Sequence, residues 1–218
     1  MHASSNWSGL AVMVLLAALP LQTGCSFLLG TKQDPVRLYV LTAQPPAASS
    51  AAETPGLELG FGPVTLPGYL DRQGIVTRVA ANRLEASRND LWAEPLGVNF
   101  RDVLAQDLRF RLTGATIRSF PWSPNAKPAL SVAVEVWRFE ATESNTAELH
   151  ARWTLKDDND AGTFVSREAT LTQRITGSGA EATVAALADA IATLSDEIAA
   201  EVAARTRTSP AKSRPTKR

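Results

Sequence analysis

The sequence predicts a single α+β domain, a sandwich in which two amphipathic helices pack on one face of a twisted sheet that is mixed or largely antiparallel. Several segments alternate apolar and polar residues, the period of a half-buried strand. Two other segments repeat apolar residues every three or four positions, the period of a helix with one buried face. About 194 residues remain after a signal-like N-terminal segment, which suffices for one domain with its own core.

The first half of the domain is predicted to contain short strands joined by turns. Residues 37–42 are rich in β-forming types, and apolar residues alternate with small or acidic ones at 57–61. The stretch between them is dense in Pro, Ala and Ser, which is typical of a loop. We therefore expect strands at 37–42, 57–61, 75–80 and 83–86, with a loop at 44–56.

A first amphipathic helix is predicted to begin between Trp92 and Pro95, because proline is tolerated in the first turn of a helix. Its apolar residues follow a helical period, so one face should lie on the sheet. A strand at 115–120 and a loop at 121–128 are expected to follow. The apolar stripe consists of Leu96, Phe100, Val103, Leu104 and Leu108.

Three long strands are predicted next. Apolar residues alternate with polar ones at 130–136 and 147–155, and less cleanly at 165–175, where Arg167 and Gln173 interrupt the pattern. Consecutive segments of this kind with short connections predict an antiparallel meander with one face in water.

The last helix is predicted to run from a capping box formed by Ser178 and Glu181 to about Arg205. Its apolar residues form a single stripe, which should pack on the same face of the sheet as the first helix. The stripe consists of Val184, Leu187, Ile191, Leu194, Ile198 and Val202.

The only cysteine, Cys25, follows an apolar run of about twelve residues. That run has the length of a signal-peptide core and is too short to span a bilayer. Because the small residue Gly24 directly precedes Cys25, we expect residues 1–24 to be a lipoprotein signal peptide and Cys25 to carry diacylglycerol, with an acyl chain such as palmitate on its freed amine. Several acyl chains would form a stable anchor. The alternative is an ordinary secretory signal followed by an inert buried cysteine.

Ser26 follows the predicted attachment site. By the bacterial sorting rule, Asp at this place retains a lipoprotein in the inner membrane, so Ser26 predicts the outer membrane, with the domain facing the periplasm. We accordingly expect a lipidated tether at 25–36, a folded domain at 37–205 and a basic tail at 206–218.

The formal net charge is zero, but the charges are unevenly distributed. Six of the 22 basic residues lie between Arg205 and Arg218, a stretch without acids, which leaves sixteen basic against 22 acidic residues elsewhere. The tail is predicted to be either a basic arm that contacts anionic lipid or peptidoglycan, or a disordered and solvated terminus. An acidic body in an exported protein argues against nucleic acid as a partner.

The sequence contains no recognisable catalytic constellation. His2 would leave with the signal peptide and His150 lies on the polar face of a predicted strand, so no histidine cluster can bind a metal. Neither glycine-rich stretch, at 60–62 or 177–179, has the pattern of a phosphate loop. A hairpin turn accounts for Asp157, Asp158 and Asp160. We therefore predict a protein that is not an enzyme and that has no metal or cofactor.

A turn-rich segment at 66–72 is the main candidate for a binding site. Proline and glycine set a turn that would present Tyr69 and Leu70 beside two charges, as in an interface anchor. The alternative is that Tyr69 and Leu70 fill the domain's own core; Trp92 and Trp153 are likewise expected in the core rather than in a contact. The segment consists of Leu66, Pro67, Gly68, Tyr69, Leu70, Asp71 and Arg72.

Four stretches carry a resemblance to a known family. They are Tyr39-Val40-Leu41, residues 66–72 continuing through Ile75-Val76-Thr77-Arg78, Asn82-Arg83-Leu84, and Trp92-Ala93-Glu94-Pro95-Leu96. In these stretches the chain resembles the PqiC-type auxiliary lipoproteins of ABC transport systems, also described as membrane-integrity-associated transporter subunits.

The resemblance implies an outer-membrane lipoprotein that works with an inner-membrane ABC transporter and a mammalian-cell-entry (MCE) domain protein. Such systems move lipids, with phospholipid as the expected cargo, and the lipoprotein would dock the MCE assembly at the outer membrane. Assembly of several copies into a ring would match a tunnel-shaped partner. A different class of function also remains open, namely a structural or regulatory envelope lipoprotein that binds peptidoglycan or an envelope synthase.

Overall fold

The computed structural model describes residues 34–46, 51–158 and 163–208. The chain divides into two compact units, Met1–Pro35 and Val36–Arg218. The first unit is described only at Asp34 and Pro35, so the fold below is that of the second. Among the helices of the described ranges, none is long and apolar enough to cross a membrane.

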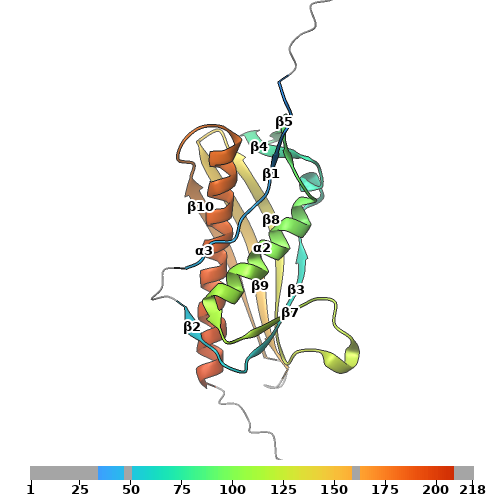
Figure 1. The fold of residues 1–218 in the computed structure, drawn as a ribbon, viewed down its shortest axis with the longest axis vertical. Helices are drawn as coiled ribbons and strands as arrows, with labels where there is room; N and C mark the ends of the chain where they lie inside the picture. The colour runs from blue at the N-terminus through green and yellow to red at the C-terminus, as the bar shows by residue number, and fades with distance from the viewer. Residues whose placement is uncertain (1–33, 47–50, 159–162, 209–218) are drawn as a thin grey trace, which may run out of the picture. The chain divides into compact units, whose positions relative to one another are not determined.

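One sheet of eight strands carries the domain (Figure 1). Followed from one hydrogen-bonded neighbour to the next, the strands run β1-β5-β4-β8-β3-β7. β3 and β4 pair with different stretches of one edge of β8, β9 pairs with its other edge, and β10 pairs with β9. A separate short ladder joins β2 (Ala52–Glu53) to β6 (Leu112–Thr113). The strands of the sheet are β1 (Arg37–Tyr39), β3 (Glu58–Thr65), β4 (Gly74–Ala80), β5 (Arg83–Trp92), β7 (Thr116–Ser119), β8 (Leu130–Thr142), β9 (Thr146–Asp157) and β10 (Thr163–Arg174).

The predicted meander is confirmed, because β8, β9 and β10 pair antiparallel in sequence order. Their alternating apolar residues form the buried side, and Trp153 is 1% exposed there. The two residues that interrupt the pattern of β10 have partners on the helix side: Arg167 binds Glu201 at 2.7 Å and the Gln173 amide donates to Thr193 at 3.0 Å. Polar side chains on this side therefore attach β10 to the last helix, although Arg167 itself stays exposed.

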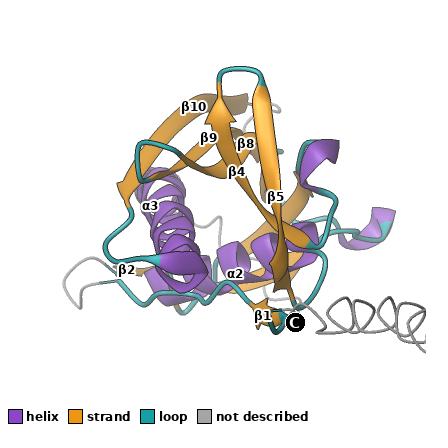
Figure 2. Cartoon of the chain, turned by 90° about the horizontal axis from the view of Figure 1, so that it is seen from above, coloured by secondary structure: helices purple, strands orange, loops and turns teal. Residues whose placement is uncertain are grey.

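Both helices lie on one side of the curved sheet (Figure 2). They are α2 (Leu96–Arg111) and α3 (Gly179–Thr208). α2 packs on β3 and β7, and α3 packs on β8, β9 and β10, with the two helices in contact. Pro95 is the N-cap residue of α2, and α3 continues three residues beyond the expected end at Arg205. The α+β class, the mixed sheet and the two helices agree with the prediction.

Four boundaries in the first half differ from the prediction. β3 continues to Thr65 and does not end at residue 61. β1 ends at Tyr39 and not at residue 42, because the next segment leaves the sheet and the Leu41 amide donates to Asn99 Oδ1 in α2 at 2.6 Å. The expected loop at 44–56 contains β2. β5 extends to Trp92 instead of ending at residue 86, because its polar second half pairs in parallel with β1, where Arg37 binds Asp90 at 2.7 Å.

Candidate functional site

The segment at 66–72 lies at an interruption in the sheet. β9 pairs along one edge of β8, so β3 and β4 share the other edge, both parallel to β8. The β3 ladder ends at Thr65 opposite Glu135, and the β4 ladder begins at Thr77 opposite Ala141. The connecting segment, including the 3-10 turn η2 (Gly68–Leu70), therefore occupies the stretch of β8 edge that neither strand pairs with. Its position is fixed by strands on both sides.

A buried carboxylate, Glu140 of β8, holds this segment in place. Its side chain is 0% exposed and accepts hydrogen bonds from the Tyr69 hydroxyl and, at 2.7 Å, from Arg78 of β4. Burial, and then the hydrogen bond to Glu140, raise the pKa of Tyr69 well above its usual value, so the hydroxyl remains the donor. Arg138 approaches the same carboxylate at 3.6 Å and binds Glu148 at 2.8 Å. A buried acid with two cationic neighbours thus ties the segment to β4 and β8.

The segment has an inner and an outer side. Leu70 is 3% exposed and belongs to the core, as the alternative interpretation of the sequence proposed, and Tyr69 is partly buried. Gly68, Asp71 and Arg72 are exposed, while Leu66 and Pro67 are half-buried. Arg72 Nε donates to the Tyr69 carbonyl at 2.6 Å, which holds the guanidinium against the turn. The surface available to a partner is thus a small, rigid, mixed-charge turn; its role in binding stays a prediction.

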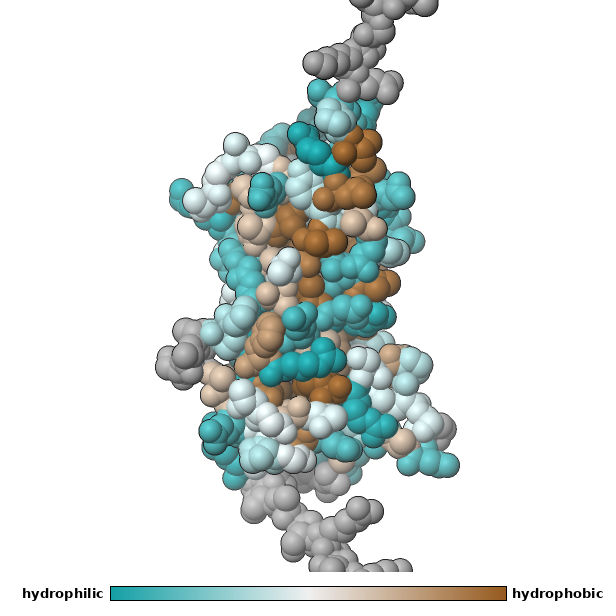
Figure 3. All heavy atoms as spheres, in the orientation of Figure 1, coloured by the Kyte–Doolittle hydropathy of each residue, from teal (hydrophilic) through white to brown (hydrophobic). Residues whose placement is uncertain are grey.

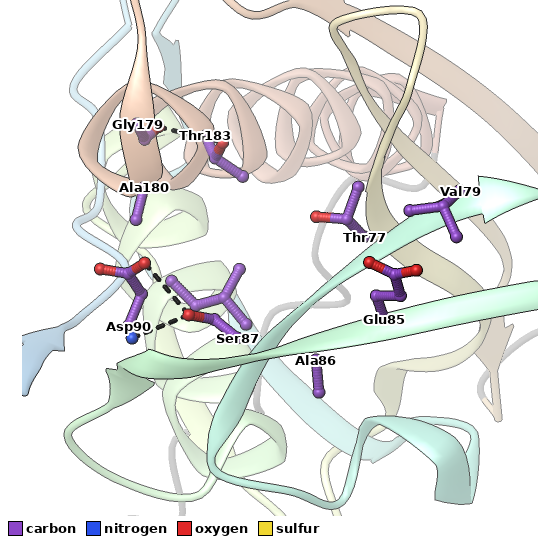
Figure 4. A pocket seen from close by; sticks show the side chains of 10 residues that line it. Thr77, Val79, Glu85, Ala86, Ser87, Asp90, Gly179, Ala180 and Thr183 are labelled. Atoms are coloured by element: carbon purple, nitrogen blue, oxygen red, sulfur yellow. Dashed lines mark hydrogen bonds between the residues drawn. The ribbon is translucent and has the colours of Figure 1, made fainter. Parts of the chain in front are cut away.

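A cleft of about 420 Å³ opens between the β4–β5 hairpin and the start of α3 (Figure 4). Ile75, Thr77 and Val79 line it from β4, and the first turn of α3 faces them across the opening. The acids in its wall are Glu85 and Asp90 of β5. Asp90 is neutralised by Arg37, whose hydrogen bond holds the pKa of this carboxyl below its usual value. The cleft separates the first turn of α3 from the β4–β5 hairpin, so α3 does not pack directly on this part of the hairpin.

A strap of chain, residues 41–46, crosses α2 and α3 between β1 and β2 (Figure 1). The Gln44 amide donates to Asp107 Oδ1 at 2.6 Å, and the Gln44 side chain donates to Asp189 of α3 at 2.7 Å. Arg111 donates to the Gln44 carbonyl at 2.9 Å and binds Asp196 at 2.6 Å. Burial raises the pKa of Asp107 to about 6. The strap is thus attached to both helices through their polar residues.

The glycines at 60–62 have a packing role. A side-chain carbon at Gly60 would lie 2.7 Å from the Trp122 ring, and one at Gly62 would lie 2.8 Å from Phe120. Both aromatic residues belong to the loop at 120–128, which covers the outer side of β3. Close packing of these aromatic side chains against the β3 backbone, and not phosphate binding, accounts for this glycine pair.

The other residues singled out in the sequence are accounted for by core packing, surface position or ion pairs. Trp92 is buried in the core, as is Trp153. His150 is partly exposed on the outer side of β9, 4.0 Å from Glu148. Asp158 binds Lys127 at 2.6 Å and Lys156 at 2.8 Å, which fits a turn held by ion pairs. Asp160 lies outside the described residues.

Comparison with known proteins identifies the family. Residues 39–199 match the family model described as the ABC-type transport auxiliary lipoprotein component. The chain belongs to this family. It is 28% identical over 155 residues to the intermembrane transport lipoprotein PqiC of Escherichia coli (strain K12), across 71% of this chain and 77% of that protein. PqiC of Shigella flexneri gives the same values.

Solved structures with the same fold accompany this family assignment. A crystal structure of an uncharacterized protein superposes with a TM-score of 0.65 at 23% identity, covering 78% of this chain and 99% of that chain. Protein XCC0632 from Xanthomonas campestris superposes with a TM-score of 0.60 at 17% identity, covering 79% of this chain and 99% of that chain. At these identities the likeness concerns the fold.

The family assignment covers the domain and not the predicted anchor. Cys25, the expected lipid attachment site of this transport auxiliary lipoprotein, lies outside the described residues and outside the matched range. The part of the basic tail at 209–218 also lies outside the described residues. Both remain predictions.

Sequence reasoning missed the residues that position the site. Glu140 lies beyond the predicted strand at 130–136 and after a register shift between Val136 and Arg138, and its burial depends on Tyr69 and Arg78 from distant parts of the chain. Asn99 and Asp107 lie in a predicted helix, and the strap that covers them comes from a segment expected to be a loop. The one available signal was Arg78, which closes the resembling stretch at 75–78.

Proposed function

We propose that this chain is a non-enzymatic lipoprotein subunit of an intermembrane phospholipid transport system, anchored through Cys25 in the outer membrane and facing the periplasm. It docks the periplasmic assembly of an MCE-domain protein that is served by an inner-membrane ABC transporter. The observation that carries the proposal is the family match over residues 39–199, which spans the folded unit from β1 into α3. The name of the PqiC relatives, intermembrane transport lipoprotein, supports the same role.

The docking surface in this proposal is the exposed part of the segment at 66–72. Glu140 and Leu70 fix the segment from below, so Gly68, Asp71 and Arg72 keep one arrangement before any partner arrives. A preorganised surface loses less conformational entropy on binding. Asp71 and Arg72 together offer both signs of charge, which favours orientation and specificity over affinity.

Site-specific photo-crosslinking in intact envelopes tests the docking surface. A photoreactive amino acid at Gly68, Asp71 or Arg72 should give an adduct in which mass spectrometry identifies the MCE-domain protein. The same amino acid at Thr172, an exposed position on β10, is the matched control and should give none. The docking role is overturned if no segment position yields the MCE protein, if Thr172 yields it equally, or if the adduct contains an envelope synthase instead.

Mass spectrometry of the mature N-terminus tests the anchor separately. We expect a chain that begins at Cys25 and carries three acyl chains on sulfur-linked glycerol and amine. A mature chain cut elsewhere, or an unmodified Cys25, contradicts the anchor and leaves the crosslinking result to be judged independently.

A further inference from the structure

Exposed apolar side chains gather at one place in the domain. Val36, Leu38 and Val40 are 58%, 65% and 49% exposed and alternate along β1 and its flanks. We call them the β1 row. Figure 3 shows apolar residues collected over the β1 end of the face it displays. Clusters of exposed apolar residues mark interaction sites, whereas scattered ones need no explanation.

The opposite side of the same strand explains why the β1 row faces outward. Arg37 and the Tyr39 hydroxyl both bind Asp90, at 2.7 and 3.3 Å, and Leu41 enters the core. These contacts fix the orientation of β1, so the alternate residues must point away from the domain. Leu38 lies in register with Leu91 of β5, which is half-buried, so the apolar surface extends onto the next strand.

Two other exposed apolar residues, Trp137 and Phe120, have local contacts, and Phe164 stands alone near the start of β10. Trp137 lies under the Arg152 guanidinium at 4.8 Å, and the Phe120 ring packs edge-on against Trp122 at 5.3 Å. For the β1 row the described part of the domain offers no covering element on the outer side, as the exposed fractions of its three side chains show. Asp90, the carboxylate of the β1–β5 ladder, is paired with Arg37, so no free acid in this ladder opposes an apolar contact.

We propose that the β1 row rests on the surface of the bilayer that carries the Cys25 anchor. This inference depends on the anchoring part of the proposed function. Val36 lies eleven positions after Cys25, so the row is held within at most about 40 Å of the lipidated residue. A protein interface needs roughly 800 Å² on each partner, far more than three aliphatic side chains provide. Protruding apolar side chains on an already tethered domain need only a nearby apolar surface, and the membrane interface is that surface.

A fluorescence experiment with an artificial anchor tests the contact. The chain from Ser26 onward has no cysteine and retains the whole core, which lies within Val36–Arg218. With an N-terminal histidine tag it can be attached to vesicles of phosphatidylethanolamine, phosphatidylglycerol and a nickel-chelating lipid. An environment-sensitive dye on a cysteine replacing Leu38 should be quenched several-fold more by lipids with nitroxide-labelled acyl chains than the same dye on Phe164→Cys, a position with 67% exposure.

A second variant separates contact from labelling. With the dye at Val40→Cys, the pair Val36→Thr and Leu38→Gln should abolish the extra quenching and leave the far-UV circular dichroism unchanged, because both side chains are exposed. Equal quenching at positions 38 and 164, or none at 38, overturns the proposal. A dye response at position 38 that appears without vesicles and rises with protein concentration also overturns it, in favour of a second copy. No transport partner and no acylation of Cys25 enters this experiment, so its failure is distinct from failure of the proposed function.

Discussion

The two halves of the sheet differ in what covers them. β8, β9 and β10 bury their alternating apolar residues under α3, and β3 and β7 lie under α2. The β4–β5 hairpin and β1 extend beyond the helices; this hairpin end has an open cleft on one side, an apolar row on its outer strand and the segment at 66–72 at its base. The helix-covered half provides most of the core, whereas the hairpin end leaves surface free for other molecules.

The strand contact between these halves is polar. β4 pairs with β8 through Thr77 and Arg78, and the cluster around Glu140 lies beside this pairing, while Ile75, Val76 and Trp92 join the common core. A junction of this kind has a defined geometry because hydrogen bonds are directional, and it depends on a few groups. Changes at those groups should therefore separate the behaviour of the two halves.

The largest expected effect is that of Glu140→Gln. Removing this buried charge leaves Arg78 and Arg138 without their shared partner, and we expect a loss of about 3–5 kcal/mol in the free energy of unfolding measured in urea. Hydrogen exchange should show the greatest loss of protection in β4 and β5. Glu148→Gln is the control, because its carboxylate is partly exposed and should cost less than about 1 kcal/mol. Uniform loss of protection in all strands would contradict the separation of the halves.

The next effect concerns Asp107 and pH. Its pKa is raised from 3.8 to about 6 in the native state, so between about pH 4 and 6 the folded protein keeps a proton that the unfolded chain has lost. The contribution of Asp107 to the free energy of unfolding is therefore greatest at low pH. It decreases as pH rises through this window, by at most about 3 kcal/mol. Asp107→Asn should remove this decrease, as urea titrations at several pH values would show.

The control for the pH experiment is Asp189→Asn, which alters an exposed acid of α3 that accepts a hydrogen bond from the same strap. It should leave the slope between pH 4 and 6 in place. An unchanged slope in the Asp107→Asn variant would mean that another group holds the proton.

The smallest effect is expected for Gly60→Ala on the outer side of the helix-covered half. The new methyl group would meet the Trp122 ring, and displacing that ring should cost about 1–3 kcal/mol and change the tryptophan fluorescence. Gly97→Ala is the matched control, since nothing lies within 4 Å of a side-chain carbon there and alanine favours the helix. Crosslinking from Arg72 should be the same in both variants, because neither touches the hairpin end.

The same contrast explains what sequence alone could predict. β9 was expected at 147–155 and spans Thr146–Asp157, and the stripe of α3 was identified residue by residue, because each has a local period and buries one side. The parallel pairing of β3 and β4 with one edge of β8 has no local signal, since it depends on segments more than 60 residues apart. For the same reason the sequence could mark residues 66–72 as unusual but could not decide that Leu70 faces the core while Asp71 and Arg72 face water.

The strap at 41–46 has a mechanical consequence. Tension that enters the domain at Val36 would act first on the three-residue ladder of β1, and then on the bonds from Leu41 to Asn99 and from Gln44 to Asp107. Those bonds end on α2, and the Gln44 side chain and Arg111 extend the connection to α3. A pull on the N-terminal side of the domain is thus shared between β5 and the two core helices, and the turn at 66–72 does not lie on this path.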